Sequence, residues 1–139
     1  MKENTMNLPV YLFLGFRLLE VNYFRKEDNA LESFGFHIID SHFNQKNEVY
    51  SMTIRFHLKF SGDEESYFIF NTAFNIIDIE WYNNQPENQI KGLFLSVVFP
   101  YIREKVFSLS HDYRNSVEIP TLDLRGLDLK DAVIFEKTK

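Results

Sequence analysis

The clearest hydrophobic pattern lies in residues 48–60, where apolar and polar side chains alternate strictly. Strict alternation is typical of a strand that buries one face and leaves the other in water. A polar turn at residues 61–64 follows, and residues 66–80 are at first rich in Phe and Ile on both faces. We therefore expect residues 66–80 to form a central strand, paired in a hairpin with residues 48–60.

Two earlier segments, residues 10–24 and 31–43, also predict strands, but each shifts its apolar phase partway along. In the first segment, one apolar series ends at Leu18 and another begins at Leu19. Such a shift indicates either a β-bulge or burial on both faces. Polar residues predict a loop at 25–30 and a turn at 44–47.

Beyond Trp81 the hydrophobic period changes, because from Ile90 to Leu109 apolar residues recur every three or four positions. This spacing predicts an amphipathic helix, and Pro100 inside it predicts a kink. We expect an extended tail over residues 116–129 and a short helix over residues 131–137. The pattern as a whole predicts one α+β domain, residues 1–139, in which a four-stranded antiparallel meander sheet is followed by a long helix packed on one face.

Aromatic residues make up 17% of the chain, with 15 Phe among 139 residues. A core of this size does not easily bury so many rings, so the surplus predicts an oligomer interface or an exposed binding surface. A Phe-rich core is the alternative reading. The net charge of −5 argues against nucleic acid as a partner, because there is no basic surplus to neutralise phosphates.

Cysteine is absent, which excludes disulfides and thiolate metal sites. The apolar run at residues 8–16 is too short to span a bilayer and lacks the flanks of a signal peptide. We expect a cytoplasmic protein with no membrane insertion.

The sequence predicts no catalytic residue, cofactor or metal site. His37 and His42 are five apart on a predicted strand, so we expect them on opposite faces. A triad of Ser108, His111 and Asp112 would lack an oxyanion site. Carboxylates at 78 and 80 share one face of the predicted strand, where solvated surface acids are the common case.

The helix carries the segment Val-Phe-Pro-Tyr-Ile-Arg-Glu at residues 98–104. It resembles the Phe-Pro-Tyr-Ala-Arg-Glu signature in the long helix of SecB, the bacterial export chaperone. Residues 74–80 are similar to the end of the fourth SecB strand, and residues 120–124 and 126–129 are similar to the segments after the helix. Three motifs occur in order, each on its expected element, and the specific part of the resemblance covers about residues 66–132.

The resemblance implies a SecB-like fold, assembly into a dimer or tetramer, and ATP-independent binding of unfolded polypeptides for export. It also implies SecA as a possible partner. Two departures weaken that expectation: Tyr67 stands where SecB presents an acidic residue, and the chain stops soon after Phe135. The wet face of the third strand is basic, with Arg55, His57 and Lys59. We therefore expect weak or no SecA binding, and a dedicated chaperone outside general export, such as one for an antitoxin, is the alternative.

A holdase needs adaptable apolar walls, and surrounding negative charge favours basic clients. The client-binding candidates where the first two strands meet are Tyr23, Phe24, Leu31, Phe34 and Phe36. The candidates for the opposite wall are Phe99, Leu122, Leu124 and Leu127. The candidates for an oligomer interface are Val98, Tyr101 and Ile102.

All of the client-binding candidates could instead be core residues. A different class of function, a small-ligand protein or an enzyme, would need a closed pocket within one subunit that holds a paired acid and base.

Overall fold

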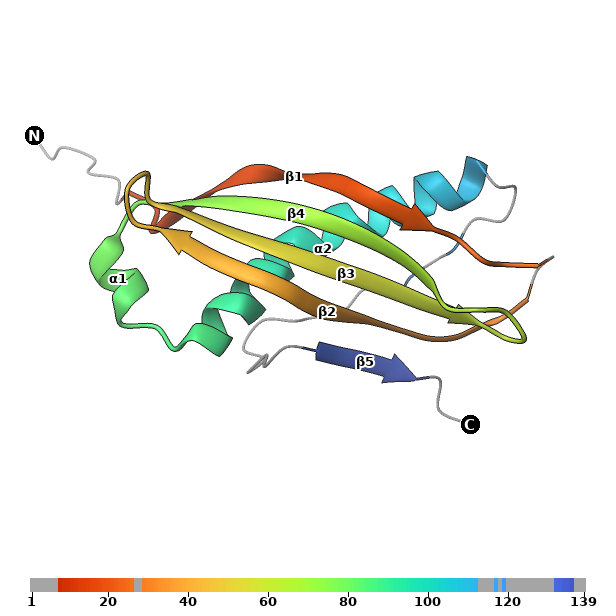
Figure 1. The fold of residues 1–139 in the computed structure, drawn as a ribbon. Coiled ribbons are helices and arrows are strands. Elements are labelled where there is room, and N and C mark those ends of the chain that lie inside the picture. Colours follow the sequence, from red (N-terminus) through yellow and green to blue (C-terminus); the bar gives the residue numbers. More distant parts are fainter. Residues whose placement is uncertain (1–7, 27–28, 113–116, 118, 120–131, 137–139) are drawn as a thin grey trace, which may run out of the picture.

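The computed structural model describes residues 8–26, 29–112, 117, 119 and 132–136, with the backbone alone for residues 112 and 132–136. Its strands are β1 (Tyr11–Asn22), β2 (Leu31–Asn44), β3 (Val49–Phe60), β4 (Ser66–Ile76) and β5 (Ala132–Glu136). Its helices are α1 (Ile79–Asn83) and α2 (Glu87–Asp112). The four long strands followed by a long helix confirm the predicted α+β class (Figure 1).

The sheet runs in the order β1-β4-β3-β2-β5, and every pair of neighbours is antiparallel. Strands β2, β3 and β4 form the predicted meander, and β4 lies inside the sheet as expected. Strand β1 differs from a simple meander, because it crosses the sheet to pair with β4 instead of β2. As a result β1 is an edge strand of the described sheet.

The short helix predicted over residues 131–137 is wrong, because residues 132–136 form strand β5 against β2. This segment includes adjacent Val and Ile, which favour a strand, and β2 offers it an open edge. The extended tail expected over residues 116–129 lies outside the described residues, apart from residues 117 and 119.

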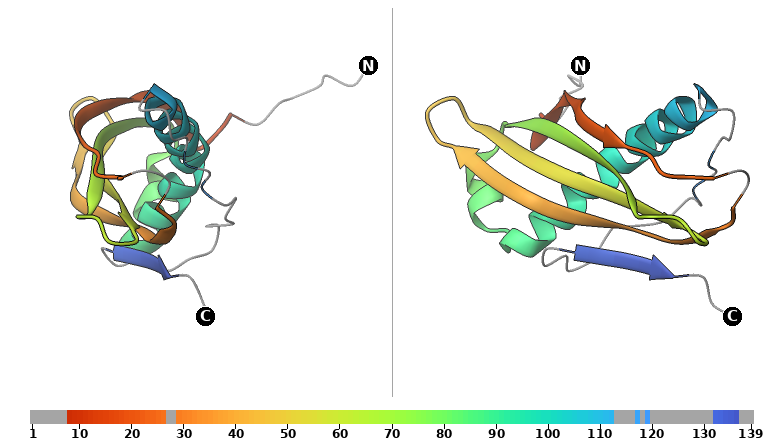
Figure 2. Two further views of the ribbon diagram at one scale, coloured as in Figure 1. Left: turned by 90° about the vertical axis from the view of Figure 1, so that its right-hand side faces the viewer. Right: turned by 45° about the vertical axis from the view of Figure 1, so that its right-hand side comes forward.

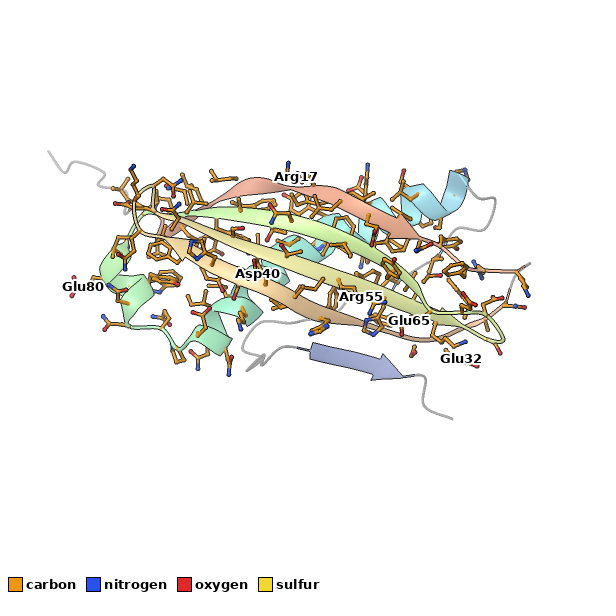
Figure 3. All side chains as sticks on the ribbon, in the orientation of Figure 1. Arg17, Glu32, Asp40, Arg55, Glu65 and Glu80 are labelled. Atoms are coloured by element: carbon orange, nitrogen blue, oxygen red, sulfur yellow. The ribbon has the colours of Figure 1, made fainter. Side chains whose placement is uncertain are left out.

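Strand β3 follows its alternating pattern throughout, and its inward side chains are fully buried. The core also takes the inward rings of β4 and the apolar face of α2. Helix α2 covers one face of the curved sheet and leaves the other face bare (Figures 1 and 2). We call the bare face the outer face; Arg17, Asp40 and Arg55 stand on it (Figure 3).

The phase shifts in the first two strands are β-bulges, one of the two readings of the sequence. The register skips one residue at each of four places: Leu14, Leu19, Glu32 and Ile39. The extra residue has no partner in the ladder, so the residues before and after it continue the same inward and outward alternation. Three of the four are apolar, and Leu14, Leu19 and Ile39 are 56%, 51% and 50% exposed.

The fourth strand ends at Ile76, so its predicted extension to residue 80 is wrong. Asp78 instead caps α1, where its side chain accepts a hydrogen bond of 2.9 Å from the backbone N–H of Trp81. An aspartate at this position satisfies a free donor of the first turn, which favours helix over strand. Asp78 and Glu80 therefore do not share a strand face. Helix α2 continues through Pro100.

Candidate functional site

Two of the predicted client-binding residues on β2 are core residues. Phe36 is fully buried and Phe34 is 7% exposed, and both rings pack on Phe56 at centroid distances of 5.0 and 6.2 Å. The register explains this position, because both residues lie opposite inward residues of β3. The expectation that they are directly accessible to a client is therefore wrong for the folded subunit.

The same holds for three residues of α2. Phe99 is 3% exposed and packs edge-on against Phe36 at 5.3 Å. Val98 and Ile102 are fully buried against the sheet, so they have no surface to offer an oligomer interface. They follow the inward stripe of the helix at three- and four-residue spacing. The candidates Leu122, Leu124 and Leu127 lie outside the described residues.

The remaining candidates gather at the end of the sheet where β1 leaves it. Tyr23 is half-buried against Phe60 and Phe68, with ring centroids 5.8 and 6.2 Å away. Leu31 is half-buried nearby in the same core cluster. Phe24 is 38% exposed and presents its ring to water. This end of the sheet, Tyr23, Phe24 and Leu31, is called the aromatic end below.

Polar contacts hold the aromatic end in place. Ser66 Oγ accepts a 2.6 Å hydrogen bond from the backbone N–H of Phe24 and donates one of 3.1 Å to its carbonyl. The guanidinium of Arg25 lies 4.6 Å above the ring of Phe60. Backbone and side-chain bonds of this kind fix the chain without covering the ring of Phe24.

Asp63, in the turn between β3 and β4, binds the loop between β1 and β2. Its Oδ2 accepts hydrogen bonds from the backbone N–H of Lys26 at 3.0 Å and from the amide of Asn29 at 3.1 Å. The ammonium of Lys59 donates to the Asp63 carbonyl. Burial by itself raises the pKa of this carboxyl, but the two hydrogen bonds and the nearby charges of Lys26 and Lys59 outweigh it and hold the pKa below the ordinary value of 3.8.

The outward face of α2 meets strand β1 through one ring. Tyr101 packs on Phe13 and Phe16 at 5.2 and 5.7 Å, yet it is still 45% exposed. Phe107 lies further along the helix and is 43% exposed. The large apolar residues that β1 and α2 leave exposed are together called the β1 border below: Leu12, Leu14, Leu19, Tyr101 and Phe107.

An open hollow of about 300 Å³ on α2 is lined by Glu104, Phe107, Ser108 and His111. It brings an acid, a hydroxyl and an imidazole near one another. All three side chains are exposed to water on a single helix. Nucleophilic catalysis needs a base oriented by a third group and a place for developing negative charge, in a site that limits water. This hollow is therefore not the closed pocket that an enzyme would require.

The histidines of β2 correct another expectation. The bulge at Ile39 places His37 and His42 on the same outer face, opposite Arg55 and Ser51 of β3. Without the bulge, five-residue spacing would have separated them. Even so, no group of three or more His, Asp or Glu side chains within the described residues could hold a metal ion.

Outer-face polar groups near β4 bind one another. Asn22 donates a 2.8 Å hydrogen bond to the hydroxyl of Tyr67, and Arg55 lies 4.6 Å above the Tyr67 ring. Arg55 also forms a 3.1 Å salt bridge with Glu65. The basic face predicted from the sequence is thus partly neutralised by a neighbouring acid. Burial lowers the pKa of His57, with Arg55 and His37 adding to the effect and Glu65 opposing it.

Comparison with known proteins bears on the fold. No protein-family model matches the chain, and no curated protein matches it in sequence. Among solved structures, it is similar to the SecB-like chaperone Rv1957 of Mycobacterium tuberculosis, solved in complex with a ChAD peptide from the Rv1956 HigA1 antitoxin. The TM-score is 0.57 over 81% of this chain and 90% of that chain, at 17% identity. The fold is SecB-like.

The SecB-like fold confirms the architecture that the resemblance implied. The sequence analysis predicted Tyr101 but missed the other residues of the β1 border. The phase shift at Leu18 and Leu19 was the sequence signal for this feature. It was compatible with either a β-bulge or burial on both faces. No helix within the described residues combines the length and apolar character needed to cross a membrane.

Proposed function

We propose that this protein is an ATP-independent holdase chaperone that binds unfolded polypeptides and performs no catalytic step. The observation that carries the proposal is a complete aromatic core accompanied by further large apolar side chains at the surface. Phe24, Tyr101 and Phe107 are each more than one-third exposed although the core already buries many Phe rings. Apolar surface that a small protein leaves uncovered marks an interaction site.

The fold and the charge support the same proposal. A SecB-like chaperone of the same fold was solved with a peptide bound, so this architecture can hold a polypeptide segment. The net charge of −5 favours clients with basic segments and keeps a protein with exposed rings soluble. Such a protein would act in the cytoplasm, where newly made chains are still unfolded.

We place the client at the aromatic end. Tyr23, Phe24 and Leu31 would contact it directly, while the buried rings of Phe34, Phe36 and Phe99 would act indirectly, as core residues of the subunit. Leu122, Leu124 and Leu127 would supply a second wall, as the sequence suggested. Shallow aromatic contacts of this kind bind without sequence rules, because rings accept many apolar partners.

The oligomer, a dimer or tetramer, would form through the β1 border. Strand β1 is an edge strand, and exposed edges carrying apolar side chains are prone to pair with another chain. Tyr101 lies where α2 meets that edge, so it would be buried by a second subunit. Val98 and Ile102 would act indirectly by fixing the helix to its own sheet.

A dedicated client is the second candidate, within the same class. Tyr67 and Arg55 interact with each other, Asn22 and Glu65, so the outer face lacks a free acidic surface at this point. This observation favours weak or no SecA binding and a role outside general export. Service to an antitoxin is one such role.

The direct test is suppression of aggregation. Light scattering would follow a reduced, unfolded client during refolding, with and without this protein and in the absence of ATP. We expect a dose-dependent loss of scattering that ATP does not change. Light-scattering masses would also show a stable complex larger than the free oligomer. Unchanged scattering at a molar excess over several unrelated clients would overturn the proposal.

A further inference from the structure

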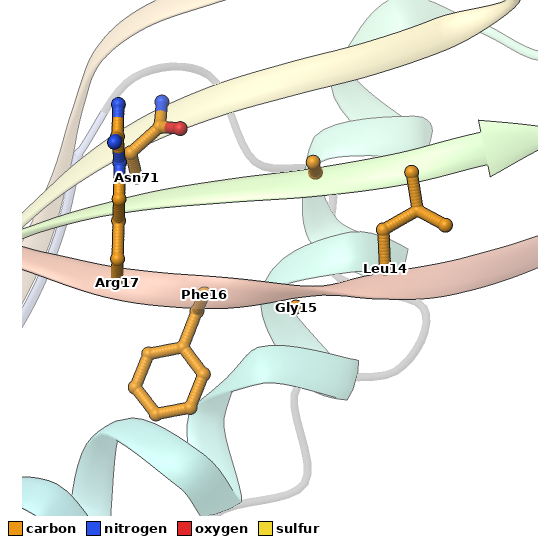
Figure 4. Close-up of a pocket in the computed structure, with 6 residues that line it drawn as sticks. Leu14, Gly15, Phe16, Arg17 and Asn71 are labelled. Carbon is orange, nitrogen blue, oxygen red and sulfur yellow. The ribbon is translucent and has the colours of Figure 1, made fainter.

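A hollow of about 280 Å³ lies between β1 and β4 on the outer face of the sheet, on the side away from α2 (Figure 4). Gly15 of β1 and Ala73 of β4 lie directly opposite each other and form its floor. Leu14, displaced outward by the bulge, forms one wall, and the ring of Phe16 points the other way, towards α2 (Figure 4).

The backbone keeps this hollow open. Gly15 has φ of +141°, which L side chains rarely adopt, and a Cβ built there would meet nothing within 4 Å. A larger residue at this position would be strained by its backbone, although space is available. The bulge and the glycine therefore maintain an apolar depression on the outer face.

Arg17 and Asn71 stand together at the other end of the hollow (Figure 4). Asn71 is fixed by a 3.2 Å hydrogen bond from its amide to Thr53 Oγ1. Arg17 is exposed and makes no hydrogen bond or ion pair within the described part of the chain. An unpaired guanidinium beside an apolar hollow matches a ligand that joins an apolar group to a carboxylate, because the planar fork of Arg binds carboxylates with two hydrogen bonds.

We propose that this hollow binds the carboxyl-terminal residue of a polypeptide when that residue is apolar. The side chain would fill the space over Gly15 and Ala73, and the terminal carboxylate would pair with Arg17. Gly15 and Arg17 are two positions apart on one strand, or about 7 Å, so one residue can reach both. The hollow is open to water and has room for one apolar side chain.

A chain end fits this site better than an internal acidic residue. In an extended chain, an acid next to an apolar residue points to the opposite side. A chain that continued past the apolar residue would have to cross the wall made by Arg17 and Asn71. The inference does not rest on the holdase function, because the hollow shares no residue with the aromatic end and shares only Leu14 with the β1 border.

The test uses four N-acetylated peptides and amide chemical shifts of the ¹⁵N-labelled protein. The first ends in Gly-Ser-Gly-Leu with a free carboxylate, the second has the same sequence with an amide end, and the third ends in Gly-Ser-Gly-Gly with a free carboxylate. The fourth is amidated and carries Leu-Ser-Asp internally. We expect saturable shifts at Gly15 and Ala73 with the first peptide and at least tenfold weaker binding of the others, about 1.4 kcal/mol.

Two variants separate the parts of the site. Arg17→Gln should reduce binding of the first peptide to that of its amide, and Ala73→Met should abolish it by filling the hollow. Arg55→Gln removes the same charge from the same face, where Arg55 already pairs with Glu65, and should leave binding unchanged. Equal binding of acid and amide, shifts located elsewhere, or undiminished binding by Ala73→Met would each overturn the proposal. Tight binding of the internal Leu-Ser-Asp peptide would overturn the preference for chain ends.

Discussion

The ring of Phe94 lies nearly parallel to the ring of Phe74, with 8° between their planes and 4.0 Å between their centroids. Phe94 belongs to α2 and Phe74 to β4, so this stack joins the helix to the sheet. Two further rings, Tyr11 and Tyr50, meet Phe94 edge-on at 5.0 and 5.2 Å. Phe94 is therefore the point at which the helix touches three strands at once.

Phe94→Ala should lower the free energy of unfolding by about 3–5 kcal/mol, because it removes a fully buried ring and leaves a cavity. Urea unfolding would measure the loss. Lys105→Ala, on the exposed side of the same helix, should change stability by less than about 0.5 kcal/mol. A Phe94→Ala loss no larger than that of the control would mean that the stack does not anchor α2.

Tyr101→Ala should shift the protein to smaller species in sedimentation velocity. The ring is half exposed, so its packing on Phe13 and Phe16 contributes about 1–3 kcal/mol within the subunit, less than a buried ring would. Tyr101→Phe keeps the ring and should assemble like the wild type. An unchanged oligomer in Tyr101→Ala would remove this residue from the interface.

Phe24→Ser should weaken the suppression of client aggregation severalfold while the oligomer stays intact, because the ring lies at the surface and its backbone is held independently by Ser66. Ile39→Ser is the matched control: Ile39 is also exposed and apolar, but it lies at the second bulge of β2, eight positions from Leu31. Light scattering of refolding clients would compare the two. If both variants lose activity equally, the aromatic end is not the client surface.

Asp63→Asn should destabilise the protein at about pH 7 and much less in acid. The folded pKa lies below the ordinary value of 3.8, so the ionised carboxylate stabilises the folded state above that value. The contribution is lost as the pH falls through the lower folded pKa. Urea midpoints would be measured for the wild type and the variant at a series of acidic pH values. The difference between the two midpoints should shrink as the pH falls. A gap that persists in strong acid would attribute the effect to packing instead of charge.

An alkaline titration should reveal Tyr82. Burial, with the nearby charge of Glu87, raises its pKa from 10.0 to about 12. Because the folded pKa is raised, the associated stability is present below pH 10.0 and is lost between pH 10.0 and about 12. Across this pH range, the free energy of unfolding measured with urea should fall less steeply for Tyr82→Phe than for the wild type. Equal slopes in the two proteins would show that Tyr82 ionises equally in the folded and unfolded states.

The sequence alone predicted the elements of this fold well where the periodicity was long. Strand β3 and helix α2 follow their patterns because each buries one continuous face. The placement of β1 was not predictable in this way, since alternation shows which face of a strand is buried but not which strand it joins. Helix α1 was missed because one capping aspartate, Asp78, ends the strand pattern early.

The candidate site was predicted less completely than the fold. The sequence does not distinguish an exposed Phe from a buried one, so Phe24 and Phe36 could not be assigned to surface or core before the register was known. Likewise, a phase shift shows that an extra residue exists without showing where it points. The structure supplies that direction for Leu14 and Leu19.

The four bulges also bear on how this protein can change over generations. Each extra residue could be removed by the loss of a single codon, and the inward positions on both sides would keep their phase. Deleting Leu14 or Leu19 would straighten β1 and withdraw one adhesive side chain without touching the core. Small insertions and deletions inside a strand usually disrupt its register. At these bulges they would instead let the apolar surface evolve separately from the fold.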